Sequence, residues 1–268
     1  MTAWLLAYLA LGAFVGFFAG LLGIGGGGVM VPLLVMLFAA QGLPTEQIMH
    51  LALGSSMAAI VFTSISSMRA HQAHGAVIWR IVAHITPGIL LGAVLGTYIA
   101  SRVPTKALAT IFTVFICYVS VQMVLNIKPR PQRDMPGLLG TSAVGMGIGA
   151  LSCLVAIGGG ALSVPFMTWC NVRIQHAIGT SAAIGFPIAL GGALGYIWNG
   201  WSAPGLPAGS LGFVYVPAVL AMVVSSVLTA PLGARLTHRL PVTTLKRVFA
   251  AILLALAIKM LWGFFSAP

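Results

Sequence analysis

The chain has 268 residues, of which 59% are hydrophobic and only 6% are charged, and its formal net charge is +11. A soluble domain contains about 25% charged residues, and two acidic residues cannot cover a water-facing surface, so the composition excludes a soluble domain and indicates an integral membrane protein. The basic residues lie in the short gaps between apolar stretches, as the positive-inside rule describes, so we expect lipid and no nucleic acid around this chain.

Ten apolar segments follow one another along the sequence. Eight are near the ~20 residues needed to cross a bilayer, whereas the second and seventh span about half of it at 1.5 Å per residue. The expected ranges are 3–23, 29–41, 48–68, 81–100, 107–127, 137–157, 162–170, 176–197, 213–233 and 245–265. The sequence therefore predicts an all-α integral membrane fold whose second and seventh segments are short or discontinuous.

Three blocks of the first half recur, in the same order, in the second half. LLGIGGGGVMVPL (21–33) matches LVAIGGGALSVPF (154–166), HLALGSSMAA (50–59) matches QHAIGTSAAI (175–184), and GTYIASRVPTKAL (96–108) matches GARLTHRLPVTTL (233–245). We therefore expect an N-terminal repeat over 1–127, a linker over 128–136 and a C-terminal repeat over 137–268. Because each repeat has five segments, an odd number, the second would enter the membrane upside down relative to the first.

The distribution of lysine and arginine predicts the orientation. With the N-terminus outside and ten crossings, the inside holds ten basic residues, counting Lys246 and Arg247 at the start of the tenth segment, and the outside gaps hold only Arg102 and Lys106. This count places both termini outside and the linker in the cytoplasm. Re-entrant hairpins made from segments 1 with 2 and 6 with 7 would give the same count, so that alternative stays open.

The stretch GIGGGG contains GxGxxG from Gly23 to Gly28, which is also the signature of a dinucleotide-binding loop. That loop needs a surrounding βαβ unit, whereas these glycines interrupt membrane-grade apolar sequence, so we expect no cofactor. Close helix packing and a broken helix remain as interpretations. A broken helix would direct the N-termini of two half-helices at a pocket suited to an anion. The candidate binding residues of these two motifs are Gly25, Gly26, Gly27, Gly158, Gly159 and Gly160.

Two hydroxyl pairs are the expected companions of the glycine motifs. They are Ser55 with Ser56 and Thr180 with Ser181, at corresponding positions of the two repeats. A helix starting near Pro44 would carry Ser55 about 15 Å into the membrane, so we expect these hydroxyls to bind substrate near the midplane. The alternative is that they bond back to carbonyl groups of their own helices.

Histidines are the remaining titratable candidates inside the membrane. His50 and His176 lie about one turn before the hydroxyl pairs and are candidates for a proton relay, with simple solvation at the interface as the alternative. Glu46 and Asp134 both fall in expected loops, which leaves no carboxylate inside the membrane for proton or cation coupling. The cysteines and histidines show no metal-ligand spacing, so no metal is expected.

These motifs, GIGGGGVMVPLL with AIGGGALSVPF, LGSS with IGTS, HGAVIWR and PLGARLTHRLP, resemble the TauE/SafE sulfite exporter family from about Gly16 to Lys259. The resemblance implies a carrier in the inner cell membrane for small sulfur anions such as sulfite or organosulfonates. The first hydroxyl of the family's usual GTS is Ser55 here, which keeps the chemistry.

The sequence thus predicts a secondary transporter of a small oxyanion that works by alternating access. An anion channel of the same fold, or a transporter of another small organic acid, is the alternative, because the membrane segments lack a carboxylate. An integral-membrane enzyme is disfavoured because no catalytic dyad or metal cluster is found. The direction of transport, the coupling to protons and the formation of a homo-oligomer stay open.

Overall fold

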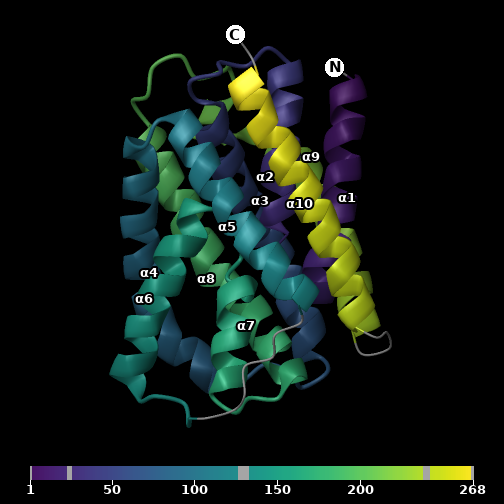
Figure 1. Ribbon diagram of the computed structural model, residues 1–268, viewed down its shortest axis with the longest axis vertical. Helices are drawn as coiled ribbons and strands as arrows, with labels where there is room; N and C mark the ends of the chain where they lie inside the picture. Colours follow the sequence, from purple (N-terminus) through teal and green to yellow (C-terminus); the bar gives the residue numbers. More distant parts are fainter. Residues whose placement is uncertain (1, 23–25, 126–132, 238–241, 267–268) are drawn as a thin grey trace.

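The computed structural model describes residues 2–22, 26–125, 133–237 and 242–266 (Figure 1). These residues form ten helices and one short hairpin. The helices are α1 (Thr2–Leu22), α2 (Gly27–Ala40), α3 (Ile48–Gln72), α4 (Trp79–Arg102), α5 (Thr105–Leu125), α6 (Leu138–Leu154), α7 (Gly160–Trp169), α8 (Ile174–Gly200), α9 (Val216–Thr237) and α10 (Val242–Ser266). The antiparallel strands β1 (Ser210–Leu211) and β2 (Val214–Tyr215) pair just before α9.

The all-helical membrane prediction is confirmed. In the described ranges, seven helices are long and apolar enough to cross a membrane, namely α1, α3, α4, α5, α8, α9 and α10. Helices α2 and α7 are short, with 14 and 10 residues. Most of the helices therefore have the lengths that the hydropathy of the sequence predicts.

Several predicted boundaries differ from the observed ones by three or four residues, and two of these differences have a local cause in the backbone. The sixth segment was expected to be full length over 137–157, but α6 has 17 residues and ends at Leu154, because the backbone turns left-handed at Ala156 (φ 47°). The ninth segment was expected to begin at 213, but Gly212 has a positive φ of 55° and Val214 pairs in β2, so α9 begins only at Val216.

Helices from the two halves of the chain pack against one another. Helix α9 lies along α1 and α3, whereas α4 lies along α6 and α8, so each of these two helices packs on partners from the other half. Helices α3 and α8 pack together in the middle, and α5 packs against α10. Figure 1 shows α1, α9 and α10 on one side of the molecule and α4 and α6 on the other.

Glycines spaced by four residues bring two of these helix pairs into close approach. A Cβ on Gly12, Gly16 or Gly20 of α1 would lie within 2.5 Å of a carbonyl oxygen of α9. Gly88, Gly92 and Gly96 of α4 face carbonyl oxygens of α6 in the same way. Small residues at such positions let transmembrane backbones pack tightly where no hydrophobic driving force acts between helices.

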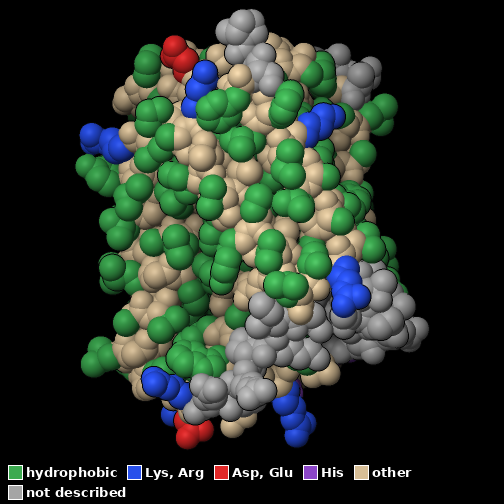
Figure 2. All heavy atoms as spheres, in the orientation of Figure 1, with side chains coloured by type: hydrophobic (Ala, Val, Ile, Leu, Met, Phe, Trp, Pro, Cys, Tyr) green, Lys and Arg blue, Asp and Glu red, His purple; other side chains and the backbone are tan. Residues whose placement is uncertain are grey.

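The surface matches a lipid environment. Figure 2 shows hydrophobic side chains over the middle of the visible face, with most basic and acidic side chains toward the two ends. Large apolar residues such as Leu91, Val94 and Leu139 are more than half exposed. The start of α1 and the end of α10 lie at the same end of the molecule (Figure 1).

Candidate functional site

The glycine motifs interrupt the helical backbone in both halves. Gly26 (φ 73°) and Gly159 (φ 79°) take left-handed conformations as the N-cap residues of α2 and α7. An L-residue with a side chain rarely adopts this conformation, which explains glycine at these positions. Gly25 lies outside the described residues. Each motif therefore starts a half-helix whose first backbone N–H groups have no partner within that helix.

The two interruptions touch each other. Gly27, the first residue of α2, packs so closely on the Ala156 carbonyl that a Cβ at Gly27 would lie 1.6 Å from that oxygen. Ala156 belongs to the turn between α6 and α7. The structure thus combines the two interpretations of the glycine motifs, because the helices are broken and the broken segments pack backbone against backbone.

The first hydroxyl of each pair accepts a hydrogen bond from the opposite half of the chain. Ser55 Oγ in α3 accepts from the Tyr215 N–H at 2.9 Å, and Thr180 Oγ1 in α8 accepts from the Ile78 N–H at 3.0 Å. Tyr215 and Ile78 directly precede α9 and α4. Both hydroxyls are fully buried, and each oxygen still carries one proton that it can donate.

The glycines before these hydroxyls let the same segments approach. A Cβ on Gly54 would lie 2.2 Å from the Phe213 carbonyl oxygen, and a Cβ on Gly179 would lie 2.7 Å from that of Ala76. The motif LGSS therefore holds the segment that leads into α9, and the motif IGTS holds the segment that leads into α4. Neither bond goes to a carbonyl group of the hydroxyl's own helix.

The second hydroxyl of each pair, Ser56 and Ser181, is also fully buried. Ser56 Oγ has no hydrogen-bond partner among the described residues.

The two histidines occupy the first turns of α3 and α8. His50 Nε2 lies 3.1 Å from the Ala100 carbonyl oxygen, so that nitrogen carries a proton, and the His50 ring packs on Phe213 at 5.0 Å between centroids. His176 is half-buried, and its Nδ1 has no partner in the described part of the chain. His50 is thus held by a carbonyl at the end of α4, and His176 keeps a free nitrogen.

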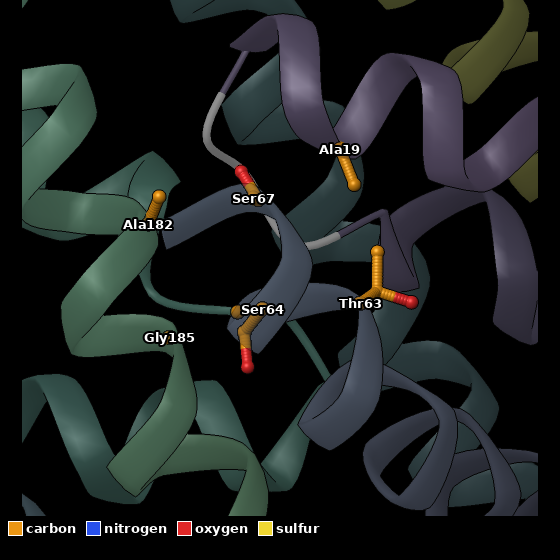
Figure 3. A pocket seen from close by; sticks show the side chains of 7 residues that line it. Ala19, Thr63, Ser64, Ser67, Ala182 and Gly185 are labelled. Carbon is orange, nitrogen blue, oxygen red and sulfur yellow. The ribbon is translucent and has the colours of Figure 1, made fainter. Parts of the chain in front are cut away.

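A small cavity beside the second interruption was missed by the sequence prediction (Figure 3). It measures about 10 Å³, and its lining includes Thr63, Ser64 and Ser67 of α3, Gly158, and Gly185 of α8. Ser67 Oγ is buried and makes no hydrogen bond to any described residue. The run FTSISS, which places four hydroxyl residues within six positions of a membrane-crossing helix, is the signal that could have identified these hydroxyls.

A second cavity of about 10 Å³ lies where the interruptions meet. It is lined by Gly26 and Gly28 from the first half and by Ile157 and Ala161, which flank Gly159, from the second. Its other walls are apolar side chains of α5 and α10. A cavity of this size holds about one water molecule, so the structure is closed around its centre.

Charged and metal-binding groups are scarce near the cavity where the two interruptions meet. The described residues contain no group of three His, Cys, Asp or Glu that could hold a metal ion. Glu46 lies between α2 and α3, and Asp134 precedes α6.

Between α7 and α8, burial raises the pKa of the Cys170 thiol, and the nearby Arg133 charge opposes this rise.

Comparison with known proteins extends the sequence resemblance over most of the chain. The family model described as "Sulfite exporter TauE/SafE" matches residues 8–260. A probable membrane transporter protein of Haemophilus influenzae is 40% identical over 262 residues, which cover 97% of this chain and 99% of that protein. The probable membrane transporter protein YdhB of Bacillus subtilis is 29% identical over 239 residues, covering 86% and 89%.

No solved structure matches this chain at a significant level. The family match and the full-length relative agree with the apolar helices and the lipid-like surface, and they identify a transporter family and not an enzyme. The chain therefore belongs to the TauE/SafE sulfite exporter family and is a probable multi-pass membrane transporter.

Proposed function

We propose that the protein is a secondary transporter of a small oxyanion, with sulfite, an organosulfonate or a related sulfur anion as its substrate. The observation that carries this proposal is the contact between the two interrupted helices at Gly27 and Ala156. The half-helices α2 and α7 both begin at these interruptions. The N-terminus of a helix offers free N–H donors and the positive end of the helix dipole, which suit an anion without a counter-ion.

The proposed binding region contains Gly26, Gly27 and Gly158 to Gly160, with Gly25 as a further sequence candidate. Ser55 and Thr180 bind backbone amides of the segments before α9 and α4. Their role in this proposal is to position those segments, while their protons remain available to substrate. Six buried serine hydroxyls have no partner among the described residues: Ser56, Ser67, Ser120, Ser152, Ser163 and Ser210. Of these, Ser56 belongs to the first hydroxyl pair and Ser67 lines the cavity beside the second interruption, so these two are the hydroxyls proposed to bond an oxyanion.

Alternating access would come from two inverted repeats, residues 1–127 and 137–268. Three pairs of corresponding contacts support this proposal: α1 on α9 with α6 on α4, α3 on α9 with α8 on α4, and Ser55 on Tyr215 with Thr180 on Ile78. A sulfite ion is larger than one water molecule, so the cavities must widen before it can bind. Rocking of one packed group of helices against the other would open them toward one side at a time.

The coupling and orientation follow from charge. With no carboxylate among the described membrane-crossing helices, His50 and His176 are the proposed proton relays. The proposed location is the inner membrane, with both termini outside and the linker 128–136, part of which lies outside the described residues, in the cytoplasm. The common end of α1 and α10 in Figure 1 supports a shared side for the termini.

Flux measurements in proteoliposomes test this function. Purified full-length protein should move at least one of sulfite, thiosulfate or an organosulfonate, and a saturable rate with exchange between two anions should identify a carrier. The absence of flux for every anion of this panel, under imposed pH and anion gradients, would refute the proposal. Unitary conductance steps in planar bilayers would instead identify an anion channel, which the lack of membrane carboxylates favours as the second candidate.

A further inference from the structure

A groove of about 510 Å³ lies between α3 and α9, on a different face of α3 from the cavity in Figure 3. Its apolar walls are Phe62, Ile65, Val227 and Pro231, and Phe62 is 49% exposed. Arg69 and Arg235 also line the groove and lie in the last turns of α3 and α9. The groove therefore has an apolar part along the helices and a cationic part at their ends.

Hydrogen bonds between the two helices fix this groove. Ser66 Oγ donates to the Val227 carbonyl oxygen at 2.9 Å, and Thr63 Oγ1 donates to Ser226 Oγ at 2.8 Å. These bonds hold α3 and α9 at a set separation directly beside the apolar walls. The groove is thus part of the packed structure and not the result of one side-chain orientation.

Arg69 and Arg235 have no counter-ion within the described chain. Both side chains are exposed, and the whole sequence offers only two carboxylate side chains, those of Glu46 and Asp134. Glu46 precedes the start of α3 and is separated from Arg69 by almost the full length of that helix, roughly 30 Å or more. Asp134 precedes α6, which packs mainly on α4. The two guanidinium groups are therefore available to an anion from outside the chain.

We propose that this groove binds one anionic phospholipid. Its phosphate would lie between Arg69 and Arg235, where guanidinium groups can form paired hydrogen bonds, and one acyl chain would follow Phe62, Ile65 and Val227. The positive-inside count puts this end of α3 and α9 at the cytoplasmic leaflet, where basic pockets between helices bind anionic headgroups. This site is independent of the transported anion and of the proposed function.

Native mass spectrometry of the full-length protein in detergent, titrated with dioleoyl phosphatidylglycerol and separately with dioleoyl phosphatidylcholine, tests the site. The wild type should bind one phosphatidylglycerol preferentially. An arginine near a membrane surface contributes about fivefold to anionic lipid affinity, so R69Q with R235Q should weaken binding about 25-fold. The matched control R80Q with R173Q removes the same charge from residues outside the groove and should bind like the wild type.

A second variant keeps both arginines and fills the groove. Ala73 is exposed and lines the groove, so A73W should block the lipid without affecting the packed core, and its phosphatidylglycerol binding should fall while its unfolding temperature does not. Equal binding of the two lipids, unchanged binding in both groove variants, or competition by 5 mM inorganic phosphate without lipid preference would overturn the proposal. Dimers in place of a lipid adduct would also overturn it, by showing that a second copy covers the groove.

Discussion

The hydroxyl oxygen of Thr180 accepts a hydrogen bond from the backbone N–H of Ile78, 102 residues earlier in the chain. Ser55 and Tyr215 form the corresponding bond over 160 residues. Each bond joins a central helix to the segment that leads into a helix of the other half. The two motifs that carry these hydroxyls therefore hold the halves together, whatever they contribute to substrate binding.

Removal of the Thr180 hydroxyl should destabilise the protein. The variant T180V leaves the part-buried Ile78 N–H without its acceptor, which costs about 1–3 kcal/mol, whereas T180S keeps the bond. Thermal unfolding in detergent should show a lower midpoint for T180V only. The control T110V, at a half-buried threonine whose hydroxyl bonds back to its own helix, should change little, and equal midpoints for T180V and T180S would contradict the assigned role.

Alanine substitutions at glycines should be graded by the space around each Cβ. G27A places its Cβ against a backbone oxygen and should abolish both transport and stable folding. G28A meets the flexible end of Leu253 at 2.9 Å and should have an intermediate effect, and G147A enters open space and should be tolerated. Size-exclusion profiles and flux rates for the three variants measure this order. A well-folded, active G27A would show that the two interruptions do not need to touch.

A proton relay through His50 predicts a selective defect. H50Q keeps a donor for the Ala100 carbonyl but cannot change its protonation state, so flux driven by a pH gradient should fall by about 100-fold or more. Anion exchange at equal pH on the two sides should stay within about twofold. H84Q, at a half-buried histidine of α4, is the control, and undiminished pH-driven flux in both H50Q and H176Q would exclude a relay through histidine.

The Cys170 thiol should react slowly with maleimides. Burial raises its pKa, so at a given pH a smaller fraction is thiolate than in an ordinary cysteine, and its alkylation rate should keep rising with pH above the usual thiol range. The measurement uses a C117A/C153A variant, which leaves one cysteine in the chain. Because the Arg133 charge lowers this pKa, R133Q should slow the reaction further. Faster alkylation in R133Q would mean that access, and not charge, controls the rate.

Hydropathy was sufficient to predict most of the fold, because a membrane-crossing helix needs a long apolar run and the charges mark its ends. The half-helices at Gly26 and Gly159 could also be expected, since consecutive glycines disfavour a continuous helix. The early end of α6 could not, because it depends on a left-handed backbone at Ala156, a conformation that an alanine rarely adopts.

The partners of the candidate residues were beyond the reach of sequence. The sequence identifies the hydroxyls of Ser55 and Thr180 as candidate binding groups because they recur at corresponding positions. Their bonds to Tyr215 and Ile78 could not be predicted, because they arise from how distant segments fold together. By contrast, the glycines at every fourth position of α1 and α4 were visible and indicate close helix packing. They name no partner, and the partners turn out to be α9 and α6.

The packing of α1 on α9 has a consequence for how the protein is made. About 200 residues separate these two helices, so at 5–20 residues per second α1 waits about 10 to 40 s in the membrane before its partner is synthesised. During that time its glycine face has only lipid or other helices to contact. Neither half can complete its own packing, so the two halves made as separate chains should be unstable alone and should reassemble when co-expressed.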